Sequence, residues 1–204
     1  MSTRSWLQEQ RAELASERIL DAAAELFFQQ GIAETSMDDV ARAAGCSRAT
    51  VYRYFDDRED LRIAFVHRET RRIGTAVGAA VAGIADPTER VIESVMLAVE
   101  SVRSRPTLHA WFASANTEIT REIVSTSAVI HHLAAGVVGQ HDDPDRCDRA
   151  RWLVRTVVSL LLIPGVSAAE ERRLVERFVA PVVIDFTQSP PGRPQRRPNA
   201  PLHS

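Results

Sequence analysis

The stretch that decides the fold is TSMDDVARAAGCSRATVYRYFDDREDL, at residues 35–61. Ser36 is placed to cap a first helix, and Asp39, three residues later, completes a capping box. Gly45 stands where this helix has to end, because glycine takes a positive φ without steric cost. Ser47 can then cap a second helix. Two short helices joined by a turn that contains glycine form the helix-turn-helix pattern.

Residues 35–61 also resemble the DNA-binding signature of the tetracycline-repressor (TetR) family. The resemblance rests on the run ARAAGCSRATVYRYF over residues 41–55, and on Arg58, Glu59 and Leu61 that follow it. It lies near the start of the 204-residue chain, before a remainder that reads as helical throughout. The family implies an all-α fold, with an N-terminal three-helix DNA-binding domain and a C-terminal helical domain for ligand binding and dimerisation.

The resemblance implies that the second helix of the motif contacts DNA. Arg48, near its start, is the candidate for bidentate reading of a guanine, and Ala49 is short enough to meet a thymine methyl group. Tyr52 matches a family tyrosine that contacts phosphate or base, and Arg58 stands where the family usually has lysine. The candidate DNA-binding residues are Thr35, Ser36, Ser47, Arg48, Ala49, Thr50, Tyr52, Arg53, Tyr54 and Arg58.

The charge of the chain limits how it can bind nucleic acid. The net charge is −2, and every cationic side chain other than histidine is arginine. Residues 1–61 hold seven arginines against twelve carboxylates, which gives this unit a net charge of −5. DNA binding must therefore depend on where the arginines face. A general nucleoid binder would need far more positive charge.

The rest of the chain predicts helices and no sheet, because no alternation of apolar and polar residues extends for any length. Residues 16–30 carry an apolar face, and we expect Phe27 and Phe28 in the core. Pro181 lies within the last helix, where we expect a kink. The other helices are expected at residues 58–84, 88–103, 107–116, 118–138, 146–163 and 169–186.

These elements divide the chain into four parts. Residues 1–15 are expected to form a flexible arm, or else an extension of the first helix. A helix-turn-helix DNA-binding domain follows at residues 16–61, and a helical regulatory and dimerisation domain at residues 62–187. Residues 188–204 are rich in proline without an apolar pattern, which predicts a disordered tail.

Neither membrane insertion nor catalysis is expected. The sequence has no run of 18 apolar residues and no apolar N-terminal stretch, so we expect a cytoplasmic protein. Cys46 and Cys147 have no zinc-site spacing, and no phosphate loop or nucleophile elbow is present. His131 and His132 are adjacent on a helix, so they cannot easily share a metal. We therefore expect no enzyme activity, no cofactor and no metal.

The resemblance implies a ligand pocket among the C-terminal helices. Small-molecule sites combine aromatic walls with a few polar anchors, and such a mixture here suggests an apolar ligand with one polar end. The alternative is an ordinary core with polar residues at the surface. The candidate ligand-binding residues are Met96, Glu100, Trp111, Phe112, Asn116, Trp152 and Arg155.

The sequence predicts a dimeric transcriptional repressor that a small molecule releases from a palindromic double-stranded DNA operator. The second motif helix is short, so two copies about 34–36 Å apart would be needed for specificity. The apolar faces at residues 146–163 and 169–186 are expected to form the homodimer interface, unless they pack only within one subunit. An activator of the same fold, and a helical protein-interaction module without DNA activity, remain as alternatives.

Overall fold

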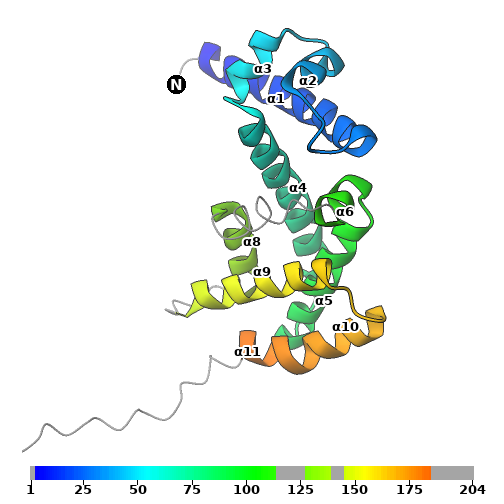
Figure 1. The fold of residues 1–204 in the computed structure, drawn as a ribbon. Coiled ribbons are helices and arrows are strands. Elements are labelled where there is room, and N and C mark those ends of the chain that lie inside the picture. The colour runs from blue at the N-terminus through cyan, green and yellow to red at the C-terminus, as the bar shows by residue number, and fades with distance from the viewer. Residues whose placement is uncertain (1–2, 114–126, 139–144, 185–204) are drawn as a thin grey trace, which may run out of the picture.

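The computed structural model of the chain describes residues 3–113, 127–138 and 145–184, and every regular element within these ranges is helical (Figure 1). The predicted all-α fold is therefore confirmed. The helices are α1 (Thr3–Gln30), α2 (Met37–Ala44), α3 (Arg48–Tyr54), α4 (Arg58–Val81), α5 (Pro87–Arg103), α6 (Pro106–Ala113), α8 (Ala128–Val138), α9 (Arg146–Leu162), α10 (Ala168–Leu174), the π-helix η1 (Val175–Val179) and α11 (Ala180–Ile184).

Side-chain caps fix the helix-turn-helix as the sequence predicts. The Asp39 backbone N–H donates to Ser36 Oγ, and the Ser36 N–H donates to Asp39 Oδ2, each at 3.2 Å. This pair is the predicted capping box. Gly45 ends α2 in the left-handed region with φ 68°. Ser47 caps α3, because its Oγ accepts the Thr50 N–H at 3.1 Å.

The first helix is longer than the sequence indicated. The arm expected at residues 1–15 is, from Thr3 onward, the first part of one helix that ends at Gln30. Phe27 is buried, with 1% of its surface exposed, whereas Phe28 is 60% exposed. Consecutive helical residues point about 100° apart, so only one of the two can face the core. The expectation that Phe28 is a core residue was wrong.

The core of the N-terminal unit continues beyond residue 61. Phe65 of α4 meets Phe27 of α1 edge to face, with ring centroids 5.3 Å apart. On its other side Phe65 stacks against Trp111 of α6, at 6.3 Å. One buried cluster therefore contains side chains from α1, α2, α3, α4 and α6. The proposed domain boundary at residue 61 is not a boundary in packing.

Helix α4 joins the two ends of the molecule. Figure 1 shows it leaving the α1–α3 unit and running to the C-terminal helices, where α9 lies across the bundle and α10, η1 and α11 form the far end. A second buried cluster lies there, formed by side chains of α5, α9, η1 and α11. Among the helices of the described ranges, none has the length and apolarity that a membrane span requires.

Two later predictions were only partly met. Ser127 lies outside any helix and α8 begins at Ala128, so the helix predicted at residues 118–138 does not run unbroken to Val138. The irregularity expected at Pro181 takes the form of the π-helical turn that ends two residues before it. Residues 118–126 and the predicted tail at 188–204 lie outside the described residues.

Candidate DNA interface and internal cavity

One side of α3 faces outward. Val51 is fully buried under the helix, which turns the opposite side away from the core. Thr50 and Tyr54 are partly exposed, and Tyr54 packs against the N-terminal core. The exposed residues at this surface are Ser47, Arg48, Ala49, Tyr52 and Arg53. Five of the predicted DNA-binding residues therefore lie exposed on one short segment.

The guanidinium of Arg48 is held by two neighbours. Its Nε lies 3.2 Å from Asp38 Oδ1 of α2, and its Nη2 donates to the Tyr52 hydroxyl at 3.4 Å. The hydrogen bond to Tyr52 and the charge of Asp38 raise the pKa of Arg48 above its ordinary value, so it is cationic at every relevant pH. An exposed ion pair of this kind opens at little cost, so Arg48 remains able to turn toward a base.

Two of the predicted contacts have other partners. Thr35 is 1% exposed, and its Oγ1 donates to the Gly31 carbonyl at 2.8 Å, so its hydroxyl serves the fold and does not face solvent. Arg58 is exposed, and its Nη1 donates to the Ala33 carbonyl at 3.0 Å. The Ser47 hydroxyl caps α3 and also lies 2.8 Å from Thr50 Oγ1.

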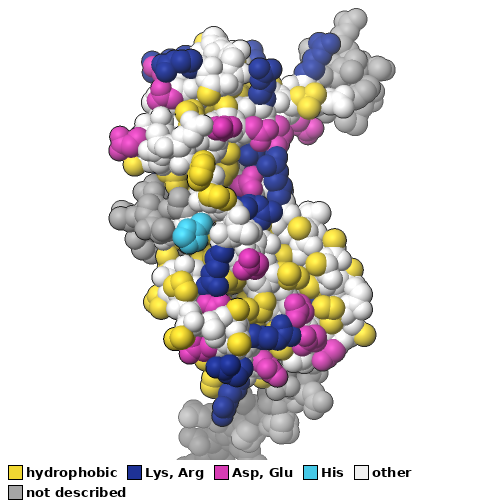
Figure 2. All heavy atoms as spheres, turned by 90° about the vertical axis from the view of Figure 1, so that its right-hand side faces the viewer, with side chains coloured by type: hydrophobic (Ala, Val, Ile, Leu, Met, Phe, Trp, Pro, Cys, Tyr) yellow, Lys and Arg dark blue, Asp and Glu magenta, His cyan; other side chains and the backbone are white. Residues whose placement is uncertain are grey.

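Two carboxylates on either side of Arg58, those of Asp57 and Asp60, accept hydrogen bonds from backbone groups. Asp57 caps α4 by accepting the Asp60 N–H at 2.8 Å, and Asp60 in turn accepts the Asp56 N–H at 3.2 Å. Figure 2 shows arginine and acidic side chains interspersed over this end of the molecule, on the face that it presents. The N-terminal unit thus offers local arginines and no broad basic face in that view.

A cavity of about 550 Å³ lies among α4, α5, α6, α8 and α9. Its wall includes Trp111 and Phe112, two of the predicted ligand-binding residues. Most of the remaining wall is aliphatic. The polar side chains on it are Glu69, Thr70, Arg90, Ser94 and His132. The volume and the apolar wall are those of a small-molecule site.

The other predicted ligand-binding residues do not line this cavity. Met96 packs against the C-terminal core, and Glu100 and Arg155 are exposed. Trp152 is 45% exposed because it lies on the outer side of α9, whereas its neighbour Leu153 faces inward. Asn116 lies outside the described residues. The choice of aromatic and polar residues missed a wall built mainly from small aliphatic ones.

A signal for the wall was present in the sequence. Small residues recur at a spacing of four along α4 and at the position that ends it, and all line the cavity: Thr70, Gly74 and Gly78 of α4, and the C-cap residue Ala82. This spacing places them along one side of the helix. At Gly74 a Cβ would lie 2.8 Å from a Leu133 methyl group of α8, so the glycine lets the two helices approach closely.

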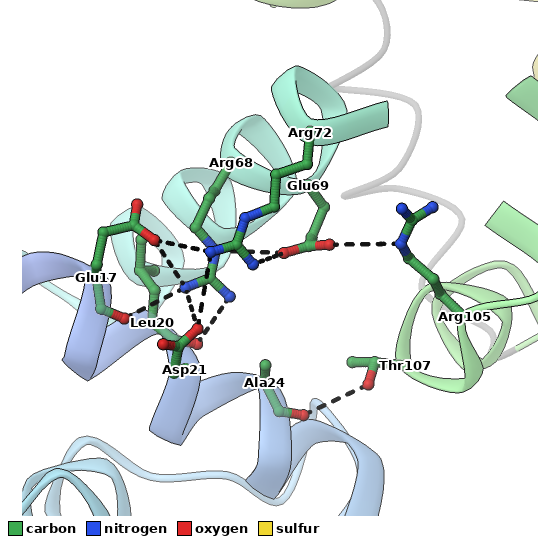
Figure 3. A network of polar contacts seen from close by, with 9 residues as sticks. All are labelled: Glu17, Leu20, Asp21, Ala24, Arg68, Glu69, Arg72, Arg105 and Thr107. Carbon is green, nitrogen blue, oxygen red and sulfur yellow. Dashed lines mark hydrogen bonds and ion pairs between the residues drawn. The ribbon is translucent and has the colours of Figure 1, made fainter. Parts of the chain in front are cut away.

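A polar network links the cavity wall to α1 (Figure 3). The Arg68 side chain of α4 is only 4% exposed. Its Nη1 donates to Asp21 Oδ1 at 2.8 Å, and its Nη2 donates to the Leu20 carbonyl at 3.3 Å. Its Nε donates to Glu69 Oε1 at 3.2 Å. Glu69 itself lines the cavity, so one buried arginine bridges the wall and the first helix.

Further arginines extend the network on both sides of Glu69. Arg72 donates to Glu69 Oε1 at 3.1 Å and to Glu17 of α1 at 2.9 Å. Arg105, just before α6, pairs with Glu69 Oε2 at 4.0 Å. Figure 3 shows these groups converging from α1, α4 and the start of α6. None of these roles was predicted, because the contacts that join the different helices are between residues far apart in the sequence and leave no local pattern.

Comparisons with known proteins identify the family. The family described as "Bacterial regulatory proteins, tetR family" matches residues 19–65. The HTH-type transcriptional regulator Rv1255c of Mycobacterium tuberculosis (strain H37Rv) is 46% identical over 186 residues, which cover 90% of this chain and 92% of that protein. A helix-turn-helix unit joined to a hollow helical domain defines a DNA-binding transcriptional regulator. The chain belongs to the TetR family.

Solved structures share the fold at low sequence identity. The TetR family repressor AlkX from Dietzia sp. strain DQ12-45-1b has a TM-score of 0.66 at 18% identity, covering 82% of this chain and 94% of AlkX. AibR, in complex with isovaleryl coenzyme A and operator DNA, has a TM-score of 0.51 at 18% identity, covering 82% of this chain and 98% of AibR. Both likenesses concern the fold.

Proposed function

We propose that this regulator is a cytoplasmic dimeric repressor that binds a palindromic operator through α3 and leaves it when a small molecule enters the cavity. The observation that carries the proposal is the continuous connection between the two sites. Phe65 contacts the N-terminal core on one side and Trp111 of the cavity wall on the other. A regulator of this fold that binds both a small molecule and DNA is also found in AibR, whose structure contains isovaleryl coenzyme A and operator DNA.

The proposed DNA contacts come from the exposed side of α3. Arg48 reads a base, and Tyr52 and Arg53 lie on the same exposed segment within reach of phosphates. Ser36, Ser47, Ala49, Thr50, Tyr54 and Arg58 remain proposed contacts at its edges. Thr35 acts by positioning the start of α2, since its hydroxyl is bonded to the Gly31 carbonyl.

The proposed dimer forms through residues 146–163 and 169–186. The inner sides of these helices already fill the C-terminal core, yet their outer sides carry further large apolar groups. Among them are Trp152 at 45%, Phe178 at 57% and Val182 at 46% exposure. Several large apolar side chains exposed on the same two segments favour an interface over solvent contact. Two pairs of helices around a two-fold axis would place two α3 helices on one operator.

Release is proposed to follow the route from the cavity to α1. A ligand that shifts α4 or α6 must move Glu69, and with it the Arg68 contacts to Asp21 and Leu20. Those contacts set the position of α1 against α4, and hence the spacing of the α3 helices in the dimer. Operator and ligand would then weaken each other's binding by the same factor.

Fluorescence anisotropy at physiological salt tests the proposal. The probe is DNA from immediately upstream of the gene for this protein, with a scrambled competitor. Saturable, preferential binding of two or four chains per site is expected. Arg48→Ala should weaken operator binding by about 1–3 kcal/mol, because a bidentate base contact is lost. Arg71→Ala, an exposed arginine on α4 outside the motif and outside the proposed dimer helices, is the control and should bind as the wild type does.

Two results would contradict the proposal. Equal, weak binding of both DNAs would favour the helical interaction module without DNA activity. Unchanged operator affinity in Arg48→Ala would remove Arg48 from the base contacts while leaving the operator itself established.

A further inference from the structure

The cavity wall carries two side chains of opposite formal charge, and only one of them is neutralised. Glu69 is 8% exposed and forms ion pairs with Arg68 at 3.2 Å, Arg72 at 3.1 Å and Arg105 at 4.0 Å. Arg90, on α5, lines the same cavity. Within the described part of the chain, no carboxylate lies within ion-pair distance of Arg90. Its side chain makes one hydrogen bond, from Nη1 to the Ile84 carbonyl at 3.2 Å.

The carboxylates nearest to Arg90 along the chain bind other partners. Asp86 caps α5 by accepting the Thr88 N–H at 3.0 Å. Glu89 and Glu93 both bind Arg172 of α10, at 2.5 and 2.6 Å. Local sequence therefore does not supply Arg90 with a counter-ion, although three carboxylates stand within four positions of it. A half-buried guanidinium at an apolar wall favours an anionic partner from outside the chain.

Arg90 and Glu69 lie at opposite ends of the cavity. Helices α4 and α5 are antiparallel neighbours, and Arg90 is 12 positions from Val102, which lies at the Glu69 end. At about 1.5 Å per residue this separation is roughly 18 Å. The wall between them is aliphatic, with Val77 and Val95 on these helices and Leu133 and Val137 on α8. The space thus suits a molecule with a polar head at Arg90 and an apolar body.

We propose that Arg90 binds the anionic head of an amphipathic effector, a carboxylate at the end of an aliphatic chain that extends toward Trp111. This inference rests on the proposed function, in which the cavity holds the effector. A carboxylate can accept two parallel N–H bonds from a guanidinium, which makes the pair strong and directional. A cationic head has no comparable site, because the one acidic group on the wall already has three arginine partners.

Three probes with the same alkyl chain test the charge preference. Calorimetric titration of the full chain without DNA would use dodecanoate, dodecanol and dodecylamine, each below its micelle concentration. Dodecanoate is expected to bind about 10-fold or more tightly than the other two, as a charge-assisted hydrogen bond to a half-buried group implies. Equal affinities, tighter binding of the amine, or no binding of any probe would overturn the proposal.

Substitutions at Arg90 test whether the anionic head group binds there. Arg90→Met should lower dodecanoate affinity about 10-fold while leaving dodecanol unchanged, and Arg90→Lys, which keeps the charge, should recover part of the loss. Arg71→Met, an exposed arginine of α4 that does not line the cavity, is the matched control. Wild-type dodecanoate affinity in Arg90→Met would overturn the assignment. Dodecanoate binding that fails to release operator would support the Arg90 site and contradict only the proposed release mechanism.

Discussion

The N-terminal unit and the region around the cavity are both built from helices, but they differ in how completely they are filled. In the first, Phe27, Val40 and Val51 are at most 1% exposed, and α2, α3 and α4 each begin at a side-chain cap. In the second, five helices surround about 550 Å³ of space, and α9, unlike α5, begins without a side-chain cap. The DNA-binding surface is held in one shape, whereas the helices around the cavity have room to adjust.

The two regions also differ in how deeply their ion pairs are buried. On the DNA-binding surface, Arg48 is exposed and pairs with Asp38. Arg48 can therefore leave Asp38 for a DNA group at little cost in free energy. In the C-terminal region, Glu171 is 1% exposed and holds Arg103 with hydrogen bonds of 2.7 and 2.8 Å. The C-terminal region thus adds a buried ion pair to its apolar core, whereas the Arg48 pair at the DNA-binding surface is exposed.

The largest effect is expected at the residue where the two regions meet. Phe65→Ala should lower the free energy of unfolding by about 3–5 kcal/mol, because a 1%-exposed aromatic side chain leaves a cavity between Phe27 and Trp111. Urea denaturation measures the loss. The matched control is Phe28→Ala, which removes a 60%-exposed ring and should change stability by less than about 0.5 kcal/mol. Equal losses in both variants would contradict the contrast in packing.

The second effect concerns the buried ion pair of the C-terminal region. Arg103→Met should cost about 3 kcal/mol of stability at pH 7, because it leaves the Glu171 charge without its main partner. Arg151→Met breaks an exposed pair with Asp148 and should cost less than about 1 kcal/mol. A loss in Arg103→Met as small as in the control would show that the C-terminal region does not depend on this pair.

The same pair predicts a dependence on pH. The hydrogen bonds from Arg103 hold the pKa of Glu171 below its ordinary value of 4.5. A carboxyl whose pKa is lowered by folding stabilises the protein fully above that ordinary value, and the contribution is lost as the pH falls through the lowered one. The stability difference between wild type and Arg103→Met should therefore be constant from pH 7 down to about pH 5 and shrink in stronger acid. A difference that grew in acid would contradict this assignment.

The smallest effect separates two glycines on the cavity side of α4. Gly78→Ala should raise stability by about 0.5–1 kcal/mol, since nothing lies within 4 Å of the new Cβ and a helical glycine is replaced. Gly74→Ala should not raise the stability in this way, because its Cβ would lie 2.8 Å from Leu133. Thermal unfolding of the two variants side by side measures the difference. Equal shifts would mean that α4 and α8 do not need the close approach.

The sequence predicted the N-terminal unit well because its signals are local. Ser36, Asp39, Gly45 and Ser47 each act on backbone groups within four residues, and each acts as expected. Phe28 was misplaced because spacing along one helix does not say which of two adjacent rings meets another helix. The burial of Arg68 likewise depends on Glu17 and Asp21, about fifty positions away.

The sequence predicted a ligand cavity among the C-terminal helices but not most of the residues that line it. Trp111 and Phe112 were expected on its wall and lie there, while Trp152 lies on the outer side of α9. A cavity is space that several helices leave unfilled, so its position follows from how they pack and not from the residues of any one of them. Two small residues of α4, Gly74 and Gly78, are part of the cavity wall, although neither an aromatic nor a polar group marks them as ligand-binding residues.

The double contact of Phe65 has a consequence for how this protein can evolve. A substitution that reshapes the wall near Trp111 also disturbs the DNA-binding core, because Phe65 touches both. At the other end, Arg90 and Val137 lie outside that core, so we expect substitutions there to affect operator recognition less. Lineages that acquire new effectors should therefore change the Arg90 end first and keep the aromatic end intact.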